Sequence, residues 1–195
     1  RKYGFTPEED EAFKPGDDAM HLLHLDEPLL EINITPDRGY AFSYRGVARE
    51  YHHSTGAAYV DPAVALNGKA PVTQGLPEGT KTDIEVIVED NNPIHGVIGC
   101  DRYYARAVHG FAPASHTPNW MRRRLTRAGM RSISLAVDVT NYVMLDLGQP
   151  MHAYDLDKIE GPIVVRRAVE GETLTTLDGK KHDLSVEDLL ITDSP

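Results

Sequence analysis

The stretch VTNYVMLDLGQPMHAYD, residues 139–155, begins as an apolar helix pattern and ends as a run of polar groups. Asp138 is suited to cap the helix, and Gly148 is suited to end it, because glycine adopts the left-handed cap conformation without strain. Pro150 then holds the residue before it in an extended conformation. The predicted buried side of the helix consists of Val139, Tyr142, Val143 and Leu147.

Hydrogen-bonding side chains gather around His152, directly after this helix break. Its polar neighbours along the chain are Asn141, Gln149, Tyr154 and Asp155. A break of this kind places the following residues on the rim of an element, where side chains can converge on a pocket. The pattern alone leaves a structural role and a catalytic role for His152 both open.

The segments on either side of this stretch predict an α+β fold. Residues 43–56 form a helix that Ser43 caps and Gly56 ends. Leu30, Ile32 and Ile34 alternate as in a half-buried strand. Further strands are predicted at residues 83–90, 102–110, 162–168, 172–184 and 187–193, and Asp178-Gly179 is predicted to form a hairpin turn within residues 172–184. Because strands cluster at the end and helices in the middle, we expect a mixed or antiparallel sheet with a few packed helices. The chain stops directly after a strand, so the fold is expected to be truncated at its C-terminus.

Composition is typical of a globular protein and opposes long-range attraction to nucleic acid. The 195 residues carry 20 Lys and Arg against 30 Asp and Glu, a formal net charge of −10, which repels phosphate. No membrane-spanning run and no signal peptide occurs, and the single cysteine suits a reducing cytoplasm. Residues 1–18 are predicted to be an acidic linker from an upstream domain, residues 65–82 an exposed loop, and residues 19–195 one module.

A local basic patch lies in the segment WMRRRLTRAGMR, residues 120–131. This segment belongs to a predicted helix that Thr117 caps, that holds Pro118 in its first turn and that Gly129 ends. The apolar stripe of the helix consists of Met121, Leu125 and Ala128, and its cationic face of Arg122, Arg123, Arg124 and Arg127. These arginines either form a solvated face or contact phosphates, to which a guanidinium offers a forked donor.

Motifs for a metal or nucleotide site are absent from the sequence. The pairs His21 with His24 and His52 with His53 lack the further ligands of a zinc site, and neither HExxH nor CxxC occurs. Cys100 has no patterned histidine or asparagine partner that would activate it as a nucleophile. No GxGxxG turn or Gly-Lys-Ser/Thr loop occurs either. The sequence therefore predicts no metal ion and no cofactor bound by this chain.

Three long strings carry a resemblance to a known family. They are DVTNYVMLDLGQPMHAYDLDKIEGPIVVRRAVEGETLTTLDGKKHDLSVEDLLITD, INITPDRGYAFSYRGVARE and GVIGCDRYYARAVHG. Over roughly residues 29–193 the chain resembles the central module of bacterial phenylalanyl-tRNA synthetase β-subunits. The resemblance implies an editing site that hydrolyses tyrosine wrongly attached to tRNA(Phe). It also implies an α-subunit partner in an α2β2 tetramer, with ATP and magnesium used by the parent enzyme, in the cytoplasm and without a membrane.

The resemblance assigns roles to particular residues. His152 matches the editing-site histidine, and Arg131 and Asn141 match positions that line the same cleft. His152 either orients or activates the hydrolytic water, or only positions the tRNA end. Family members continue into a glycine-rich loop and a strand with a tyrosine-binding glutamate, which leaves the activity of this fragment alone open. Tyr40 and Phe42 also depart from the family pattern. The alternative function is a non-catalytic scaffold that docks the α-subunit and tRNA.

Overall fold

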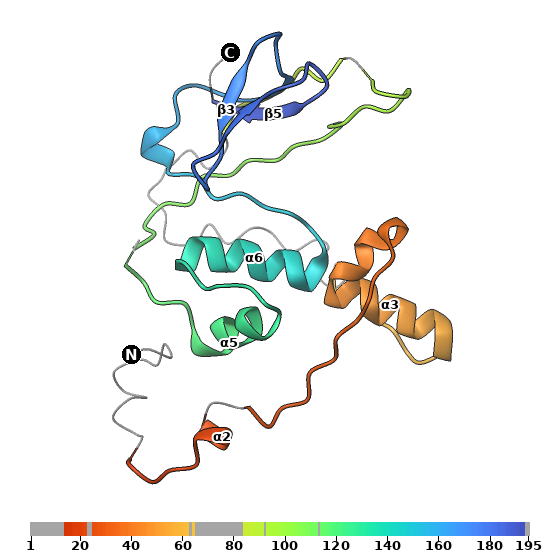
Figure 1. The fold of residues 1–195 in the computed structure, drawn as a ribbon, viewed down its shortest axis with the longest axis vertical. Coiled ribbons are helices and arrows are strands. Elements are labelled where there is room, and N and C mark those ends of the chain that lie inside the picture. Colours follow the sequence, from red (N-terminus) through yellow and green to blue (C-terminus); the bar gives the residue numbers. More distant parts are fainter. Residues whose placement is uncertain are drawn as a thin grey trace. The chain divides into compact units, whose positions relative to one another are not determined.

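The computed structural model describes residues 14–22, 25–62, 64, 84–91, 93–112 and 114–193. These residues fall into two compact units, one made of Arg1–Pro71 and Ala112–Ala153 and the other of Val72–Phe111 and Tyr154–Pro195. Helices make up the first unit, and the strands belong to the second (Figure 1). The predicted α+β class is therefore confirmed. The predicted loop 65–82 and most of the predicted linker lie outside the described residues, and the single module over 19–195 stays a prediction.

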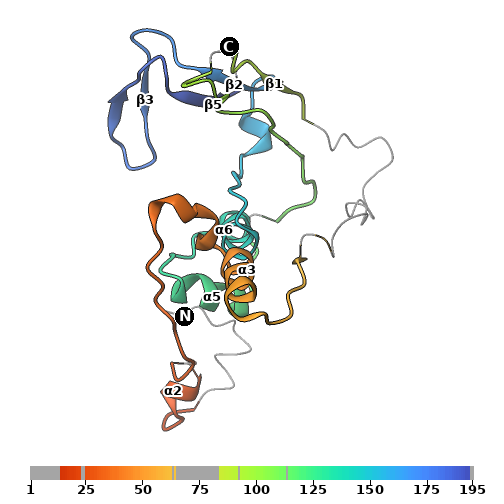
Figure 2. The same cartoon turned by 90° about the vertical axis from the view of Figure 1, so that its right-hand side faces the viewer.

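The first unit is built around one central helix. Its elements are α2 (Ala19–Leu22), the 3-10 helix η1 (Pro36–Phe42), α3 (Tyr44–Thr55), α5 (Asn119–Arg127) and α6 (Leu135–Leu147). Helix α6 packs against both α3 and α5, as the two views of Figures 1 and 2 show. Met121 and Leu125 of α5 are buried, which confirms two of the three predicted stripe residues, whereas Ala128 is exposed.

Helix α3 has the ends that its sequence predicts. The Ser43 hydroxyl oxygen accepts a hydrogen bond from the amide of Gly46 at 3.0 Å, and Gly56 ends the helix in the left-handed conformation. Gly46 is buried, and a Cβ atom built there would lie only 1.9 Å from the Tyr40 carbonyl oxygen. A side chain at this position therefore has no room unless η1 moves away from α3.

The start of α6 differs from its predicted start. The helix begins at Leu135 with Ser134 as its N-cap, so Asp138 lies inside the first turn instead of capping it. Asp138 is fully buried, whereas Val139 is exposed and the other predicted core residues of this helix are half-buried. The prediction failed because the apolar pattern continues upstream through residues 135–137 and Ser134 supplies the cap one turn earlier.

The predicted N-cap of α5 is wrong, whereas the predicted C-terminal ends of α5 and α6 are confirmed. Pro118 is the N-cap of α5, and the Thr117 hydroxyl donates to Asp138 instead of capping the helix. Gly129 after α5 and Gly148 after α6 both have left-handed φ angles, of 81° and 80°. Helix ends are thus predicted well where glycine alone can adopt the required conformation.

The second unit contains a three-stranded sheet and a separate hairpin. The sheet has the order β1 (Val86–Val88), β2 (Ile163–Arg167), β5 (Leu189–Thr192), and the hairpin joins β3 (Thr173–Thr175) to β4 (Lys181–Asp183). Strand β2 pairs with β1 in parallel and with β5 antiparallel, so the sheet is mixed as predicted. The apolar start of β2 is buried, which suits a strand with neighbours on both edges. The 3-10 helix η2 (Leu156–Lys158) precedes this strand.

Two predicted strands are wrong. Residues 28–35 are extended without a ladder partner among the described residues, and Leu30 is 85% exposed. Residues 102–110 form no strand either, although Arg106 is a single bridge residue. An alternating pattern produces a strand only where a neighbouring strand accepts its backbone hydrogen bonds, and the pattern itself carries no information on that neighbour.

Candidate functional site

The three predicted editing-site residues all lie in the first unit, along α6 and its two flanking segments. Arg131 is exposed in the turn between α5 and α6, Asn141 is half-buried in the middle of α6, and His152 is exposed after the helix has ended. A helix of 13 residues is about 20 Å long. Arg131 therefore precedes the first turn of α6 and His152 follows its last turn, and their convergence on one cleft stays a prediction.

A buried carboxylate fixes the segment next to Arg131. Asp138 accepts hydrogen bonds from the hydroxyls of Thr117 and Ser132, both at 2.5 Å, and from the Ile133 amide at 2.9 Å. Burial by itself raises the pKa of this carboxyl, but the three hydrogen bonds and the nearby Arg122 outweigh burial and lower the pKa. Asp138 is thus an anion that ties the start of α5 and the turn of Arg131 to α6.

The other end of α6 is fixed by a close approach to α3. The Gly148 amide donates to the Met144 carbonyl oxygen at 2.9 Å, and a Cβ atom at Gly148 would lie 3.0 Å from the Ser43 hydroxyl oxygen. Glycine is favoured here both by its left-handed φ and by this limited space. The segment that carries His152 therefore leaves α6 from a defined point beside the start of α3.

The arginines of α5 have partners inside the first unit. Glu27 pairs with Arg123 at 3.8 Å and with Arg127 at 3.7 Å, and Arg127 also donates to the Glu27 carbonyl oxygen. Arg124 donates to the Tyr142 hydroxyl at 2.6 Å. The predicted cationic face is therefore partly neutralised by one carboxylate, and phosphate contact by these arginines stays a prediction.

A second polar cluster, which the sequence did not suggest, lies in the second unit. Asp90 accepts hydrogen bonds from the amides of Gly99 and Cys100 at 2.6 and 2.9 Å and from Arg167 at 2.6 Å. Burial raises the pKa of Asp90, but Arg167 and the two amides lower it further than burial raises it. The carboxylate and its guanidinium are 77 residues apart in sequence, so no local pattern could have paired them.

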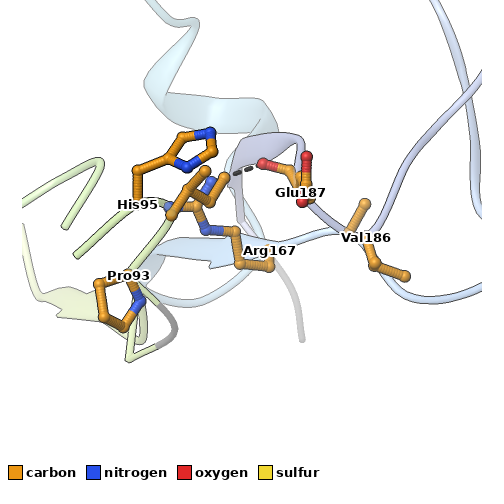
Figure 3. Close-up of a pocket in the computed structure, with 7 residues that line it drawn as sticks. Pro93, His95, Arg167, Val186 and Glu187 are labelled. Atoms are coloured by element: carbon orange, nitrogen blue, oxygen red, sulfur yellow. Dashed lines mark hydrogen bonds between the residues drawn. The ribbon is translucent and has the colours of Figure 1, made fainter. Parts of the chain in front are cut away.

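Arg167 also lines an open cavity of about 440 Å³ in this unit (Figure 3). Its guanidinium donates to the Glu187 carbonyl oxygen at 2.5 Å, and the ring of His95 lies on the same cavity. His95 has a φ of 51°, a left-handed conformation that is uncommon outside glycine. A smaller cavity of about 270 Å³ in the first unit lies between the extended residues 32–35 and α3. Neither of these two cavities is lined by the predicted editing-site residues.

Within the part of the chain that the structure describes, no group of three or more His, Cys, Asp or Glu side chains is placed to hold a metal ion. His52 uses its Nδ1 atom for a 2.5 Å hydrogen bond with the Ala57 carbonyl oxygen, and its ring centroid lies 5.3 Å from that of His53. His24 lies outside the described residues. None of the helices in the described ranges has the length and apolar character that crossing a membrane requires.

Comparison with protein families assigns a class to this fold. Residues 99–195 match the B3/4 domain, and these residues include α5, α6, β2 to β5 and the three predicted editing-site residues. Helices α5 and α6 of the first unit and strands β2 to β5 of the second unit therefore belong to the matched region, whereas α2, η1, α3 and β1 precede it.

Comparison with individual proteins identifies the family. The chain is 81% identical over 195 residues to the phenylalanine–tRNA ligase β-subunit of Bifidobacterium longum, which covers 100% of this chain and 22% of that protein. It is 54% identical over 178 residues to the β-subunit of Leifsonia xyli, covering 91% of this chain and 20% of that protein. The chain belongs to the phenylalanine–tRNA ligase β-subunit family, and it spans about a fifth of the length of these relatives.

Proposed function

We propose that this chain is the part of a phenylalanine–tRNA ligase β-subunit that hydrolyses tyrosine wrongly esterified to tRNA(Phe). The complete enzyme would join phenylalanine to its tRNA with ATP and magnesium, through an α-subunit in an α2β2 assembly in the cytoplasm. The observation that carries the proposal is the 81% identity to a named β-subunit over the whole chain. This identity extends through the string that contains His152 and Asn141, and through the segment that contains Arg131.

The chemical need for a second site follows from pocket energetics. A hydrophobic pocket shaped for phenylalanine rejects an added hydroxyl only weakly, by about a hundredfold in comparable cases. A site that hydrogen-bonds the tyrosine hydroxyl rejects phenylalanine by roughly 10⁴–10⁵, because its own polar groups would otherwise be left unpaired. Hydrolysis at such a site removes the wrong ester and spares the right one.

The proposed reaction places His152 beside the ester carbonyl. A water molecule attacks the carbonyl carbon while the imidazole of His152 accepts its proton, and the ester bond to the terminal ribose then breaks. The proton passes to the ribose oxygen, which leaves as a hydroxyl. His152 is an exposed residue, which supports a role that requires access of water. Arg131 and Asn141 would hold the ester or the terminal adenosine.

Deacylation of Tyr-tRNA(Phe) by the complete enzyme tests this proposal. His152→Ala should slow hydrolysis by about 10²–10⁴-fold, the usual contribution of a general base, and leave formation of Phe-tRNA(Phe) unchanged. His116→Ala is the matched control, because His116 is another exposed histidine of the first unit, before α5. An unchanged deacylation rate in the His152 variant would exclude a catalytic role.

A scaffold that docks the α-subunit and tRNA is the second candidate. The observation that favours it is the position of Arg131 and His152 beyond opposite ends of α6. A non-catalytic scaffold predicts that His152→Ala does not change the measured rate of Tyr-tRNA(Phe) deacylation, and that substitutions on the surface of α5 weaken subunit assembly or tRNA affinity. The same deacylation measurement therefore separates the two candidates.

A further inference from the structure

An exposed aromatic–arginine cluster joins α5 to α6, and we name it the Trp120 cluster after its most exposed ring. It consists of Trp120 and Arg124 on α5 and Tyr142 on α6. The Trp120 and Tyr142 rings meet edge to face, with centroids 5.1 Å apart at 89°. The Arg124 guanidinium lies 5.6 Å from the centroid of the Trp120 ring and 6.0 Å from that of Tyr142. Both distances fall within the range of cation–π attraction.

The members of the cluster contact one another, and the Trp120 side chain remains open to solvent. Trp120 and Arg124 are one helical turn apart, which places their side chains on the same face of α5. The hydrogen bond of 2.6 Å from Arg124 to the Tyr142 hydroxyl fixes the guanidinium against α6. Even so, Trp120 is 46% exposed, although tryptophan is on average one of the more deeply buried residue types. A large aromatic surface is thus exposed beside a guanidinium that a hydrogen bond ties to α6.

The charge of the cluster is the second feature that indicates its partner. Helix α5 carries four arginines and no carboxylate in its sequence. Glu27 pairs with Arg123 and Arg127, but among the ion pairs of the described residues none involves Arg124. Among the described residues, Arg124 contacts the Tyr142 hydroxyl and the rings of Trp120 and Tyr142, all of which are neutral. Within the described ranges, a cation that no carboxylate neutralises therefore lies beside an exposed ring.

We infer that the Trp120 cluster stacks on an unpaired nucleobase of the bound tRNA, an interaction that rests on the proposed tRNA partner. Proteins recognise single-stranded RNA by stacking its bases on aromatic rings and on arginine planes. The Trp120 cluster offers both surfaces together, and the charge of Arg124 attracts the phosphate that adjoins the stacked base. The net charge of −10 opposes RNA binding elsewhere, so a local cation at the point of stacking is needed.

Affinity for uncharged tRNA(Phe), measured with the complete enzyme, tests the cluster. Trp120→Ala should weaken binding about tenfold, within the range found when a stacking ring is removed. Trp120→Phe keeps an aromatic face and should stay within about threefold of the wild type. Tyr51→Ala is the matched control, because Tyr51 is an exposed aromatic residue of α3 in the same unit. The affinity of the Tyr51→Ala enzyme for tRNA(Phe) should equal that of the wild type.

Fluorescence provides a measurement that does not depend on folding of the alanine variant. Trp120 is the single tryptophan of these 195 residues. The difference in emission between the wild-type enzyme and Trp120→Phe therefore isolates this ring, and the difference should fall when tRNA(Phe) is added. An unchanged affinity of Trp120→Ala, or a difference signal that does not respond to tRNA, would overturn the inference. So would a variant whose only defect is in subunit assembly, because the cluster would then be a protein interface.

Failure of this inference is distinguishable from failure of the editing proposal. Trp120→Ala should lower tRNA affinity while leaving the rate of Tyr-tRNA(Phe) hydrolysis at saturating enzyme unchanged. His152→Ala should do the opposite, slowing hydrolysis while keeping both tRNA affinity and the fluorescence response. Loss of hydrolysis without loss of affinity in the Trp120 variant would contradict stacking as the role of this ring.

Discussion

Among the described residues, each unit contains one buried aspartate, and the two differ in the donors that surround them. Asp138 in the first unit accepts hydrogen bonds from two side-chain hydroxyls and one backbone amide. Asp90 in the second unit accepts hydrogen bonds from two backbone amides and a guanidinium. The exposed fractions of the two residues are 0% and 3%. Both carboxyls have a lowered pKa, so burial is overcome in both, but by different means.

The difference lies in whether the donors can reverse their role. A hydroxyl can rotate and accept a hydrogen bond, whereas a backbone amide and a guanidinium can only donate. The two hydroxyls meet Oδ2 of Asp138, and the fixed amide of Ile133 meets Oδ1. At Asp90 both oxygens face fixed donors. We therefore expect the site of Asp138 to accept an asparagine side chain in place of the carboxylate, and the site of Asp90 not to accept one.

Removing the Asp138 side chain should have the largest effect on stability. Asp138→Ala leaves the Ile133 amide and two hydroxyls without their acceptor in a buried site, which should lower the free energy of unfolding by about 3–5 kcal/mol. Hydrogen–deuterium exchange of the complete subunit should show faster exchange in residues 130–138. Asp146→Ala on the same helix is the control and should cost about 1 kcal/mol or less. Slow exchange in the Asp138 variant would show that the turn of Arg131 is held by other contacts.

The same residue shows what the sequence could and could not predict. Gly129 and Gly148 predicted both helix ends correctly, because a left-handed φ is a local requirement. The role of Asp138 was predicted as a cap, since an aspartate before an apolar run favours that position. Its actual partner Thr117 is 21 residues away, and only the packing of α5 on α6 brings the two together.

Prediction of the candidate site was limited in the same way, because contacts that depend on helix packing cannot be read from local sequence. His152 and Asn141 were assigned from long family strings, which carry information on role without any geometry. The Trp120 cluster escaped prediction because Tyr142 was assigned to a buried face, and its contact with Arg124 requires the second helix to be in place. The strand predicted through Leu30 was wrong because a strand needs a pairing neighbour, and no described strand pairs with these residues.

Exchanging each aspartate for asparagine tests the comparison directly and should have an intermediate effect. In Asp138→Asn the amide oxygen can keep the Ile133 bond while the NH2 group donates to the Thr117 and Ser132 hydroxyls, so exchange near Ile133 should stay close to that of the wild type. In Asp90→Asn the NH2 group must face either Arg167 or the backbone amides, which donate as well. Exchange at Gly99 and Cys100 should therefore accelerate markedly. Equal responses of the two variants would refute the distinction between rotating and fixed donors.

The smallest expected effect is the pH dependence of the two carboxylates. A group whose pKa is lower in the folded state adds stability above its unfolded pKa, about 3.9 for aspartate, and loses it as the pH falls through the folded value. Protection of the backbone amides near Asp138 and Asp90 from hydrogen exchange should therefore be complete at pH 6 and decline only below about pH 4. In the second unit a hydrogen bond from Arg166 lowers the pKa of Glu172 to about 2, so the contribution of Glu172 should decline progressively from about pH 4.3, the usual pKa of glutamate, and be nearly lost at about pH 2.

Hydrogen–deuterium exchange, corrected with unstructured reference peptides at each pH, measures this decline. Asp138→Asn removes the titrating group while keeping its hydrogen bonds, so protection near Ile133 should become independent of pH between about 4 and 2 in that variant. Protection near Gly99 should still decline in the same variant, because Asp90 is unchanged. If protection near Ile133 declined equally in wild type and variant, acid would act on the first unit through another group, and Asp138 would not be held there as an anion.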